Sequence, residues 1–273
     1  MWYIICENFI NSEKSTMAEN YNYGSILNEI CRIVRKCGDI MLKAERTPEM
    51  VRTKEGKGNF VTTYDNRNQE ILKTELMKLI PEANFVGEES DLNPDISKGY
   101  AFIVDPIDGT SNFIRDSKCS CISVAVALDN RTVIGVIFNP YLDEMFTAIE
   151  GRGAFLNGEP IHVSNLELKD GIILIGSSPY YKDMAKKTFD TAYDYFQKGL
   201  DIRRSGSAAM DFCTIAAGRA ELFFEYILSP WDYAAGMLIV KEAGGFTTGI
   251  DGNPVIYGAP SSILATNAII HNS

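Results

Sequence analysis

The stretch FIVDPIDGTSNF, residues 102–113, constrains this chain most because it places two acids at the end of an apolar run. The apolar residues predict a buried strand that ends at Asp105, and Asp108 follows three residues later. Carboxylates held this close repel each other unless a positive charge lies between them. The stretch therefore predicts a rigid edge of a folded core that needs a cation.

The composition is that of an acidic folded protein. Of the 273 residues, 45% are hydrophobic and 23% are charged, which predicts one large domain or two of roughly 100–170 residues. The formal net charge is -10. An acidic chain repels phosphate backbones, so bulk nucleic-acid binding is disfavoured, and binding of a phosphate group requires a cation.

Cysteines and apolar runs predict a cytoplasmic protein without a membrane span. The six cysteines form no CxxC pair, which is typical of a reducing compartment, and no apolar run reaches the roughly 18 residues that a span needs. We expect residues 1–22 to be a flexible N-terminal extension. Residues 1–16 lack a basic n-region and precede a second methionine, Met17, which favours an upstream-start extension or tail over a signal peptide.

The first part of the chain predicts two helices followed by a largely antiparallel sheet. Apolar residues at helical spacing indicate helices over 23–46 and 66–80, and the glycine-rich segment 53–65 between them predicts a mobile loop. Asn157-Gly158 predicts a hairpin turn. The strand candidates are 84–87, 100–105, 121–129, 131–140 and 144–150.

After about residue 165 the pattern alternates between strands and helices. We expect strands over 171–178 and 221–227, and helices over 184–197, 208–217 and 233–243. The predicted fold class is α+β with an α/β half. The α+β half spans residues 23–165 and carries most of the acids that border the apolar runs, and the α/β half spans residues 166–273 and carries Asp232.

Carboxylates border several predicted elements, at Asp65, Glu88, Asp105, Asp108 and Asp232. Oxygen ligands suit hard divalent cations, Mg²⁺ in particular, whereas only two histidines and no cysteine clusters are present. Any one of these acids alone could be a helix cap or a solvated loop residue. The pair Asp105 and Asp108 argues against that interpretation, because two acids cannot both cap one helix.

Three motifs, VGEES, DPIDGTSNF and SPWDYAAG, occur in this order and at separations that resemble the inositol monophosphatase family of magnesium-dependent phosphatases. The resemblance covers residues 24–270. It implies a layered αβαβα sandwich of the sugar phosphatase type, hydrolysis of a small-molecule phosphate ester, inhibition by lithium and a homodimer.

The resemblance also implies a set of metal ligands for two to three Mg²⁺ ions. Glu88, Asp105 and the carbonyl of Ile107 would bind the first ion, and Asp105, Asp108 and Asp232 would bind the second. A third, more weakly bound ion would contact Glu88 through a water molecule. Cations between the acids would explain their crowding.

The remaining implied roles concern water and substrate. Asp65 and Thr110 would orient and help to deprotonate the attacking water, and Gly109 and Thr110 would contact the phosphate. Glu225 would contact inositol hydroxyls, although a surface acid is the alternative interpretation. Other family positions on the substrate rim are filled by small residues that could equally serve tight turns, Ser177, Gly206, Ser207 and Ala208.

Three basic residues have open interpretations. Lys54 matches a family lysine near the metal site, but it could be a solvated loop residue. Arg203 and Arg204 could pair with a second substrate phosphate or with acids across a dimer interface.

The resemblance thus implies a phosphomonoesterase that hydrolyses inositol monophosphate, or a similar polyol phosphate, by metal-activated water attack. A 3′(2′),5′-bisphosphate nucleotidase or a fructose 1,6-bisphosphatase is the alternative within the same fold. A non-catalytic partner-binding protein is the alternative of another class. Catalysis is favoured over the latter because every implied metal-ligand position holds the expected residue.

Overall fold

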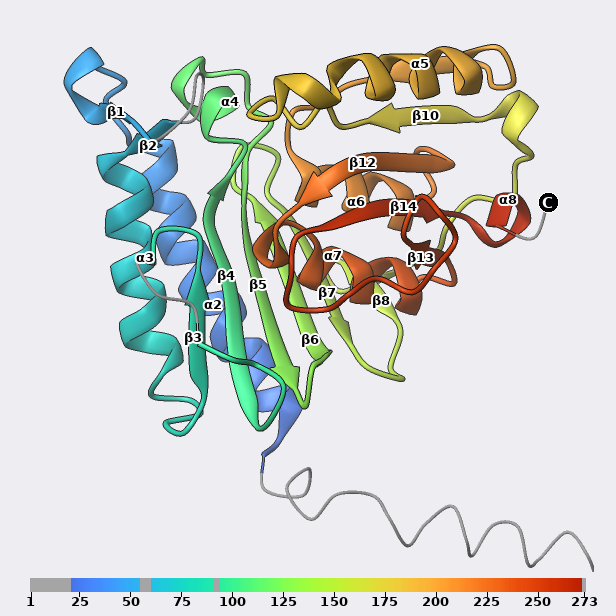
Figure 1. The fold of residues 1–273 in the computed structure, drawn as a ribbon. Helices are drawn as coiled ribbons and strands as arrows, with labels where there is room; N and C mark the ends of the chain where they lie inside the picture. The colour runs from blue at the N-terminus through green and yellow to red at the C-terminus, as the bar shows by residue number, and fades with distance from the viewer. Residues whose placement is uncertain (1–20, 55–59, 91–93, 272–273) are drawn as a thin grey trace, which may run out of the picture.

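The computed structural model describes residues 21–54, 60–90 and 94–271, which form alternating layers of helices and sheets (Figure 1). The layers follow the order helices, seven-stranded sheet, helices, five-stranded sheet, helix, so the predicted αβαβα sandwich is confirmed. Most of the predicted extension 1–22, and the centre of the predicted loop 53–65, lie outside the described residues.

The first layer is a pair of helices, α2 (Tyr23–Leu42) and α3 (Thr63–Leu76), on one face of the larger sheet. Asn22 caps α2 through its side chain. The start of α3 differs from the prediction because Thr62 and Asp65 form a reciprocal capping box, which brings the helix forward by three residues. Asp65 therefore lies in the first turn of a helix, whereas a loop was predicted there.

The seven-stranded sheet has the strand order β3-β4-β5-β6-β7-β8-β9. Strands β3 and β4 are parallel and the other neighbours are antiparallel. The strands are β3 (Asn84–Gly87), β4 (Tyr100–Asp108), β5 (Cys121–Leu128), β6 (Arg131–Asn139), β7 (Glu144–Ile149), β8 (Ala154–Leu156) and β9 (Glu159–Ile161). Both residues of the predicted Asn157-Gly158 turn have positive φ, 52° and 86°, as a tight hairpin requires.

The predicted end of β4 at Asp105 is wrong, because the strand continues to Asp108. The pairing with β5 shifts register between Asp105 and Asp108, so the acids lie on a bulged strand end. All residues of β4 are buried, since helices cover both faces of the sheet. This explains why the strand reads as a continuous apolar run before the acids.

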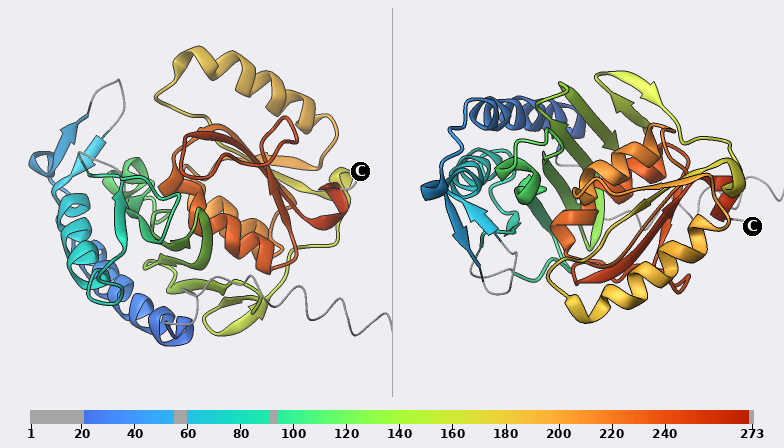
Figure 2. Two further views of the ribbon diagram at one scale, coloured as in Figure 1. Left: turned by 60° about the horizontal axis from the view of Figure 1, so that its bottom comes forward. Right: turned by 90° about the horizontal axis from the view of Figure 1, so that it is seen from above.

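The middle layer contains α6 (Ala208–Ala216) and α7 (Pro230–Glu242), which lie between the two sheets (Figure 2). The predicted start of α7 at residue 233 is wrong, because Pro230 occupies its first turn and Ser229 and Asp232 form a capping box. At Gly135 of β6 a Cβ atom would lie 2.8 Å from the carbonyl oxygen of Ala235 in α7. The close approach of β6 and α7 therefore depends on this glycine.

The smaller sheet has the strand order β11-β10-β12-β14-β13. Its strands are β10 (Ile172–Ile175), β11 (Asp201–Arg203), β12 (Leu222–Leu228), β13 (Phe246–Thr248) and β14 (Ser261–Thr266). Helix α5 (Ala185–Phe196) packs on its outer side. The proposed division of the chain at residues 165 and 166 lies between the two sheets, and one hydrophobic core joins residues of both.

Short elements complete the described chain. The strands β1 (Val51–Thr53) and β2 (Phe60–Thr62) pair with each other, and α4 (Thr110–Ile114) follows β4 directly. The others are the 3₁₀ helices η1 (Pro48–Met50), η2 (Leu168–Asp170) and η3 (Lys182–Met184), and helix α8 (Ala268–His271). In the part of the chain that the structure describes, no helix has the length and apolarity needed to cross a bilayer.

Candidate active site

A cavity of about 410 Å³ lies where the end of β4 meets α6, α7 and β12. Most of the site residues predicted from the sequence line it, although they are spread from Glu88 to Asp232 along the chain. Six of its lining residues are acidic and one is basic, Arg204. Such a cavity favours cations, and it favours anions only together with cations.

Three of the predicted metal ligands form a tight cluster. Oxygen atoms of Asp105, Asp108 and Asp232 all lie within 4.8 Å of one another. The register shift in β4 brings the first two together, and the first turn of α7 contributes the third. The sheet and the helix thus hold three carboxylates at one point.

Backbone donors fix the orientation of each carboxylate in the cluster. Asp105 Oδ1 accepts a hydrogen bond from the N–H of Ile107 at 2.9 Å, and Asp232 Oδ2 accepts one from the N–H of Ser229 at 2.7 Å. The N–H of Ala209, in the first turn of α6, donates to Asp108 Oδ2 at 2.8 Å. The oxygens are therefore positioned before any cation binds.

Burial and mutual repulsion make the ionised cluster costly. Burial, followed by the charges of Glu88 and Asp108, raises the pKa of Asp105 well above its usual value. Burial also raises the pKa of Asp108 to about 6. Because the donor set consists of oxygens only, a hard divalent cation such as Mg²⁺ fits it and would remove this cost.

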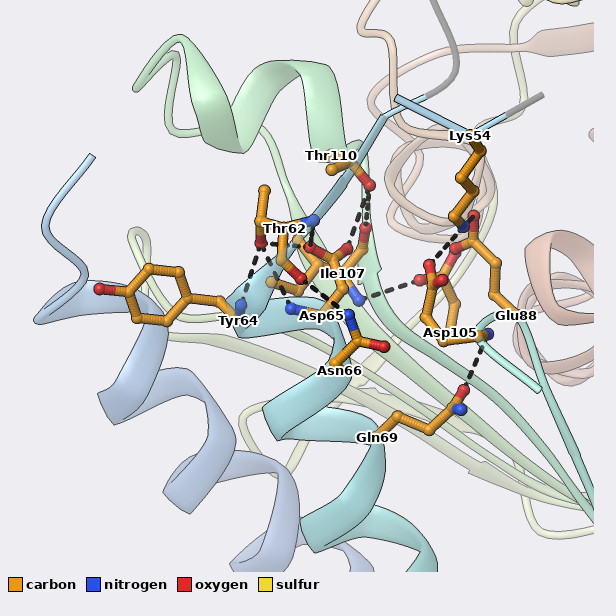
Figure 3. Close-up of polar contacts among 11 residues, drawn as sticks. Lys54, Thr62, Tyr64, Asp65, Asn66, Gln69, Glu88, Asp105, Ile107 and Thr110 are labelled. Carbon is orange, nitrogen blue, oxygen red and sulfur yellow. Dashed lines mark hydrogen bonds and ion pairs between the residues drawn. The ribbon is translucent and has the colours of Figure 1, made fainter. Parts of the chain in front are cut away.

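Glu88 and Lys54 lie beside the cluster. Lys54 Nζ donates to Glu88 Oε1 at 3.1 Å and also forms an ion pair with Glu89 (Figure 3). Burial alone would lower the pKa of Lys54, but the two carboxylates outweigh it and raise the pKa above its usual value. Lys54 is therefore next to the acidic centre and is not a solvated loop residue.

Asp65 and Thr110 are brought together from α3 and α4. Thr110 Oγ1 donates to Asp65 Oδ1 at 3.3 Å and to the carbonyl of Ile107 at 3.2 Å (Figure 3). Asp65 Oδ2 accepts from the N–H of Thr62 at 2.8 Å. Burial raises the pKa of Asp65 to about 6. The predicted pair is present, and both of its members are buried.

Gly109 and Ser207 have structural roles that the sequence interpretation did not include. Gly109 has a φ of 81°, and a Cβ atom there would lie 3.0 Å from the carbonyl oxygen of Cys119. Ser207, predicted to lie on the substrate rim, caps α6 and donates its hydroxyl to Asp108. Both residues line the cavity, as do Gly206 and Ala208.

At the end of the cavity formed by β12, Glu225 is buried and fixed. Its Oε1 accepts from the N–H of Ser178 at 2.6 Å and from the hydroxyl of Ser178 at 3.3 Å. Burial raises the pKa of Glu225 to about 7. A strand-end surface acid was the alternative interpretation, and the burial of Glu225, which is 7% exposed, excludes it.

The structure separates the two arginines. Arg203 forms an ion pair with Asp201, whereas Arg204 lines the cavity and donates its Nε to Ser177 Oγ at 3.0 Å. Only Arg204 is therefore placed to meet a bound anion.

Some residues that line the cavity were missed. Asp211 of α6 is 2% exposed, and its Oδ1 has no hydrogen-bond partner among the described residues. A lone acid within a largely apolar helix was the available signal. Tyr180 and Tyr181 also line the cavity, and nothing in their sequence context indicates this.

Comparisons with known proteins agree with this geometry. The family model described as the inositol monophosphatase family matches residues 23–273. Nus factor SuhB of Escherichia coli K12 is 36% identical over 229 residues, which cover 83% of this chain and 86% of that protein. Inositol monophosphatase 3 of Solanum lycopersicum is 33% identical over 258 residues, which cover 92% of this chain and 96% of that protein. The crystal structure of extragenic suppressor protein suhB from Bartonella henselae aligns with a TM-score of 0.84 at 33% identity, covering 91% of this chain and 96% of that one.

Replacing Asp105 by Asn should separate metal binding from folding. Without metal, the melting temperature should stay equal or rise, because the amide can still accept from the N–H of Ile107 while repulsion within the cluster decreases. Mg²⁺ at about 100 times its dissociation constant should raise the melting temperature of the wild type by about 5–10 °C. The variant should show little of this rise.

Differential scanning calorimetry with and without Mg²⁺ checks this. Asp170→Asn, at an exposed acid of η2, is the control and should respond as the wild type does. An equal Mg²⁺ response in wild type and Asp105→Asn would contradict the assignment.

Proposed function

Because the chain belongs to the inositol monophosphatase family, we propose that it is a magnesium-dependent phosphomonoesterase that hydrolyses inositol monophosphate or a similar polyol phosphate. The observation that carries this proposal is the convergence of three carboxylates and the Asp65–Thr110 pair on one end of the fold. Burying these acids together lowers the free energy of unfolding, and such clusters of acids with raised pKa values are typical of active sites.

Mg²⁺, in two to three ions, would be held by Glu88, Asp105, Asp108, Asp232 and the carbonyl of Ile107. When bound, Mg²⁺ supplies positive charge that offsets the charge developing on the phosphate and on the leaving oxygen. The backbone donors of Ile107, Ala209 and Ser229 keep the carboxylates oriented while substrate and product exchange.

The Asp65–Thr110 pair would orient the attacking water. Since the Thr110 hydroxyl donates to Asp65, its free lone pairs can accept a hydrogen bond from water and direct the water oxygen toward phosphorus. As the water attacks, its proton would pass to Thr110 Oγ1 while the Thr110 hydroxyl proton passes to the Asp65 carboxylate, which ends protonated. No covalent phosphoenzyme is needed.

The leaving group would lie toward Glu225, Ser177 and Arg204. The single arginine in the lining supports the alternative substrates, because it could bind the second phosphate of a nucleotide or sugar bisphosphate. The Escherichia coli relative named a Nus factor supports the alternative of another class, a role in binding partners. We also propose a cytoplasmic location and lithium sensitivity, from the cysteine pattern and the family likeness.

Phosphate release tests the proposed activity. With Mg²⁺, the protein should release phosphate from myo-inositol 1-phosphate faster than from 3′-phosphoadenosine 5′-phosphate or fructose 1,6-bisphosphate. Asp108→Asn should abolish release because it removes one ligand charge, and Asp170→Asn should leave it unchanged. Full activity of Asp108→Asn at matched Mg²⁺ would contradict the assignment of Asp108 as a metal ligand. If the wild type releases phosphate from none of the substrates, the proposed activity is wrong and the partner-binding role is favoured.

Glu225 should govern use of the leaving group. A carboxylate accepts charge-assisted hydrogen bonds from polyol hydroxyls, so Glu225→Gln should lower kcat/KM for inositol 1-phosphate by about tenfold to a hundredfold. It should barely change kcat/KM for p-nitrophenyl phosphate, whose leaving group has no such hydroxyls. Equal losses on both substrates would instead place Glu225 in the catalytic machinery.

We further propose that the chain forms a homodimer through α5. Phe189 and Phe196 of this outer helix and the nearby Leu200 are 57%, 48% and 64% exposed, an unusual density of large apolar groups on one surface. The double variant Phe189→Ser/Phe196→Ser should therefore shift the mass in sedimentation equilibrium from dimer to monomer. A monomeric wild type, or an unchanged dimeric variant, would refute this interface.

A further inference from the structure

The segment Gly176–Tyr181, between β10 and η3, forms a fixed rim of the cavity. The N–H of Gly176 donates to the carbonyl of Phe224 at 2.9 Å. Ser178, whose φ is 39°, is anchored to Glu225 through both its N–H and its hydroxyl. The N–H of Tyr181 donates to the carbonyl of Ser178 at 2.9 Å. These bonds fix the backbone on both sides of Pro179 and Tyr180.

Tyr180 places a polar group at the acidic centre without using it for the fold. It lines the cavity while 45% exposed, and its hydroxyl forms no hydrogen bond within the described residues. The cavity that Tyr180 lines is also lined by the acids Glu88, Asp105 and Asp232. Burial, followed by the charges of Glu88, Asp232 and Asp105, raises the pKa of Tyr180 to about 12.

A phenol at this point can act only as a neutral donor or a weak acceptor. The neighbouring acids are held by backbone donors and by Lys54, and they are the proposed ligands of cations. Once cations neutralise these acids, an incoming anion is the group whose oxygens still need hydrogen-bond donors. A phosphate offers several oxygens, and Thr110 and backbone N–H groups alone supply few hydrogen bonds to them.

We propose that Tyr180 is a substrate-binding residue whose hydroxyl donates a hydrogen bond to a phosphate oxygen of the bound ester, while the Glu225–Ser178 contact holds the rim that presents it. The inference rests on the proposed function and extends it to a residue outside the acidic motifs. It also couples the two ends of the cavity, because Glu225 at the leaving-group end positions the rim that carries the phosphate donor.

The direct test is calorimetric titration of inorganic phosphate into the protein at saturating Mg²⁺. Tyr180→Phe removes only the hydroxyl and should raise the phosphate dissociation constant by about tenfold. Tyr180→Ala also removes the ring and should raise it at least as much. Tyr21→Phe removes a hydroxyl that donates to Glu82 away from the cavity; it is the matched control and should change the constant by less than about twofold.

Two further measurements distinguish phosphate binding by Tyr180 from a role in metal binding or in leaving-group recognition. The Mg²⁺-induced rise in melting temperature should be the same in Tyr180→Phe and wild type, because the hydroxyl is not assigned to the metal. KM for inositol 1-phosphate and for p-nitrophenyl phosphate should rise by similar factors, because the two substrates share only the phosphate.

The proposal is overturned if Tyr180→Phe binds phosphate as the wild type does, even if Tyr180→Ala does not, since the ring alone would then matter. A reduced Mg²⁺ response in Tyr180→Phe, or a loss confined to inositol 1-phosphate, would also overturn it. If the wild type hydrolyses neither ester, the proposed function fails, and the phosphate titration still decides the role of Tyr180. No phosphate binding by the wild type would refute the role of Tyr180 as well.

Discussion

Repulsion among three buried carboxylates is the constraint on which the rest of this structure depends. Asp105, Asp108 and Asp232 have oxygens within 4.8 Å of one another, in a region where burial raises the pKa of each. Side chains free to move would separate. The acids stay together because a buried strand and a buried helix hold their backbones, and because N–H donors fix their oxygens.

The middle helices provide much of that restraint. Helices α6 and α7 begin at the acidic centre, so the partial positive charge of both N-termini faces the carboxylates. Their other ends are packed into a core shared by the two sheets. The glycine at position 135 permits β6 to approach α7 closely, which ties the larger sheet to the helix that carries Asp232. The position of the acids is therefore a property of the whole sandwich.

Much of this organisation could be predicted from the sequence, because the signals were local. The apolar runs of β4, β5 and β6 and the Asn157-Gly158 turn identify their elements directly. The strands β1, β2, β11 and β13 were missed because strands of three residues carry little apolar pattern, and β2 lies in a segment that was predicted to be a loop. The six-residue strand β14 was also missed, and only about half of its residues are buried. The starts of α3 and α7 were misplaced because a capping box was not recognised in either case.

The site could be predicted only where chemistry and sequence order coincide. The acids stand out because carboxylates at element ends are unusual, and the likeness of three motifs to one family gave their expected roles. The bond from Ser207 to Asp108 joins residues 99 positions apart, and only the packing of α6 against β5 and β6 of the larger sheet creates it. The positions of Tyr180 and Asp211 in the cavity likewise depend on tertiary packing that no local pattern specifies.

A divalent cation bound between these acids would resolve their crowding. Anomalous diffraction from crystals soaked in Mn²⁺, used in place of Mg²⁺, measures the cation position directly. We expect a strong anomalous peak within about 2–2.5 Å of carboxylate oxygens from Asp105, Asp108 and Asp232. The absence of a peak among these three residues, at Mn²⁺ concentrations that give peaks elsewhere on the molecule, would contradict it.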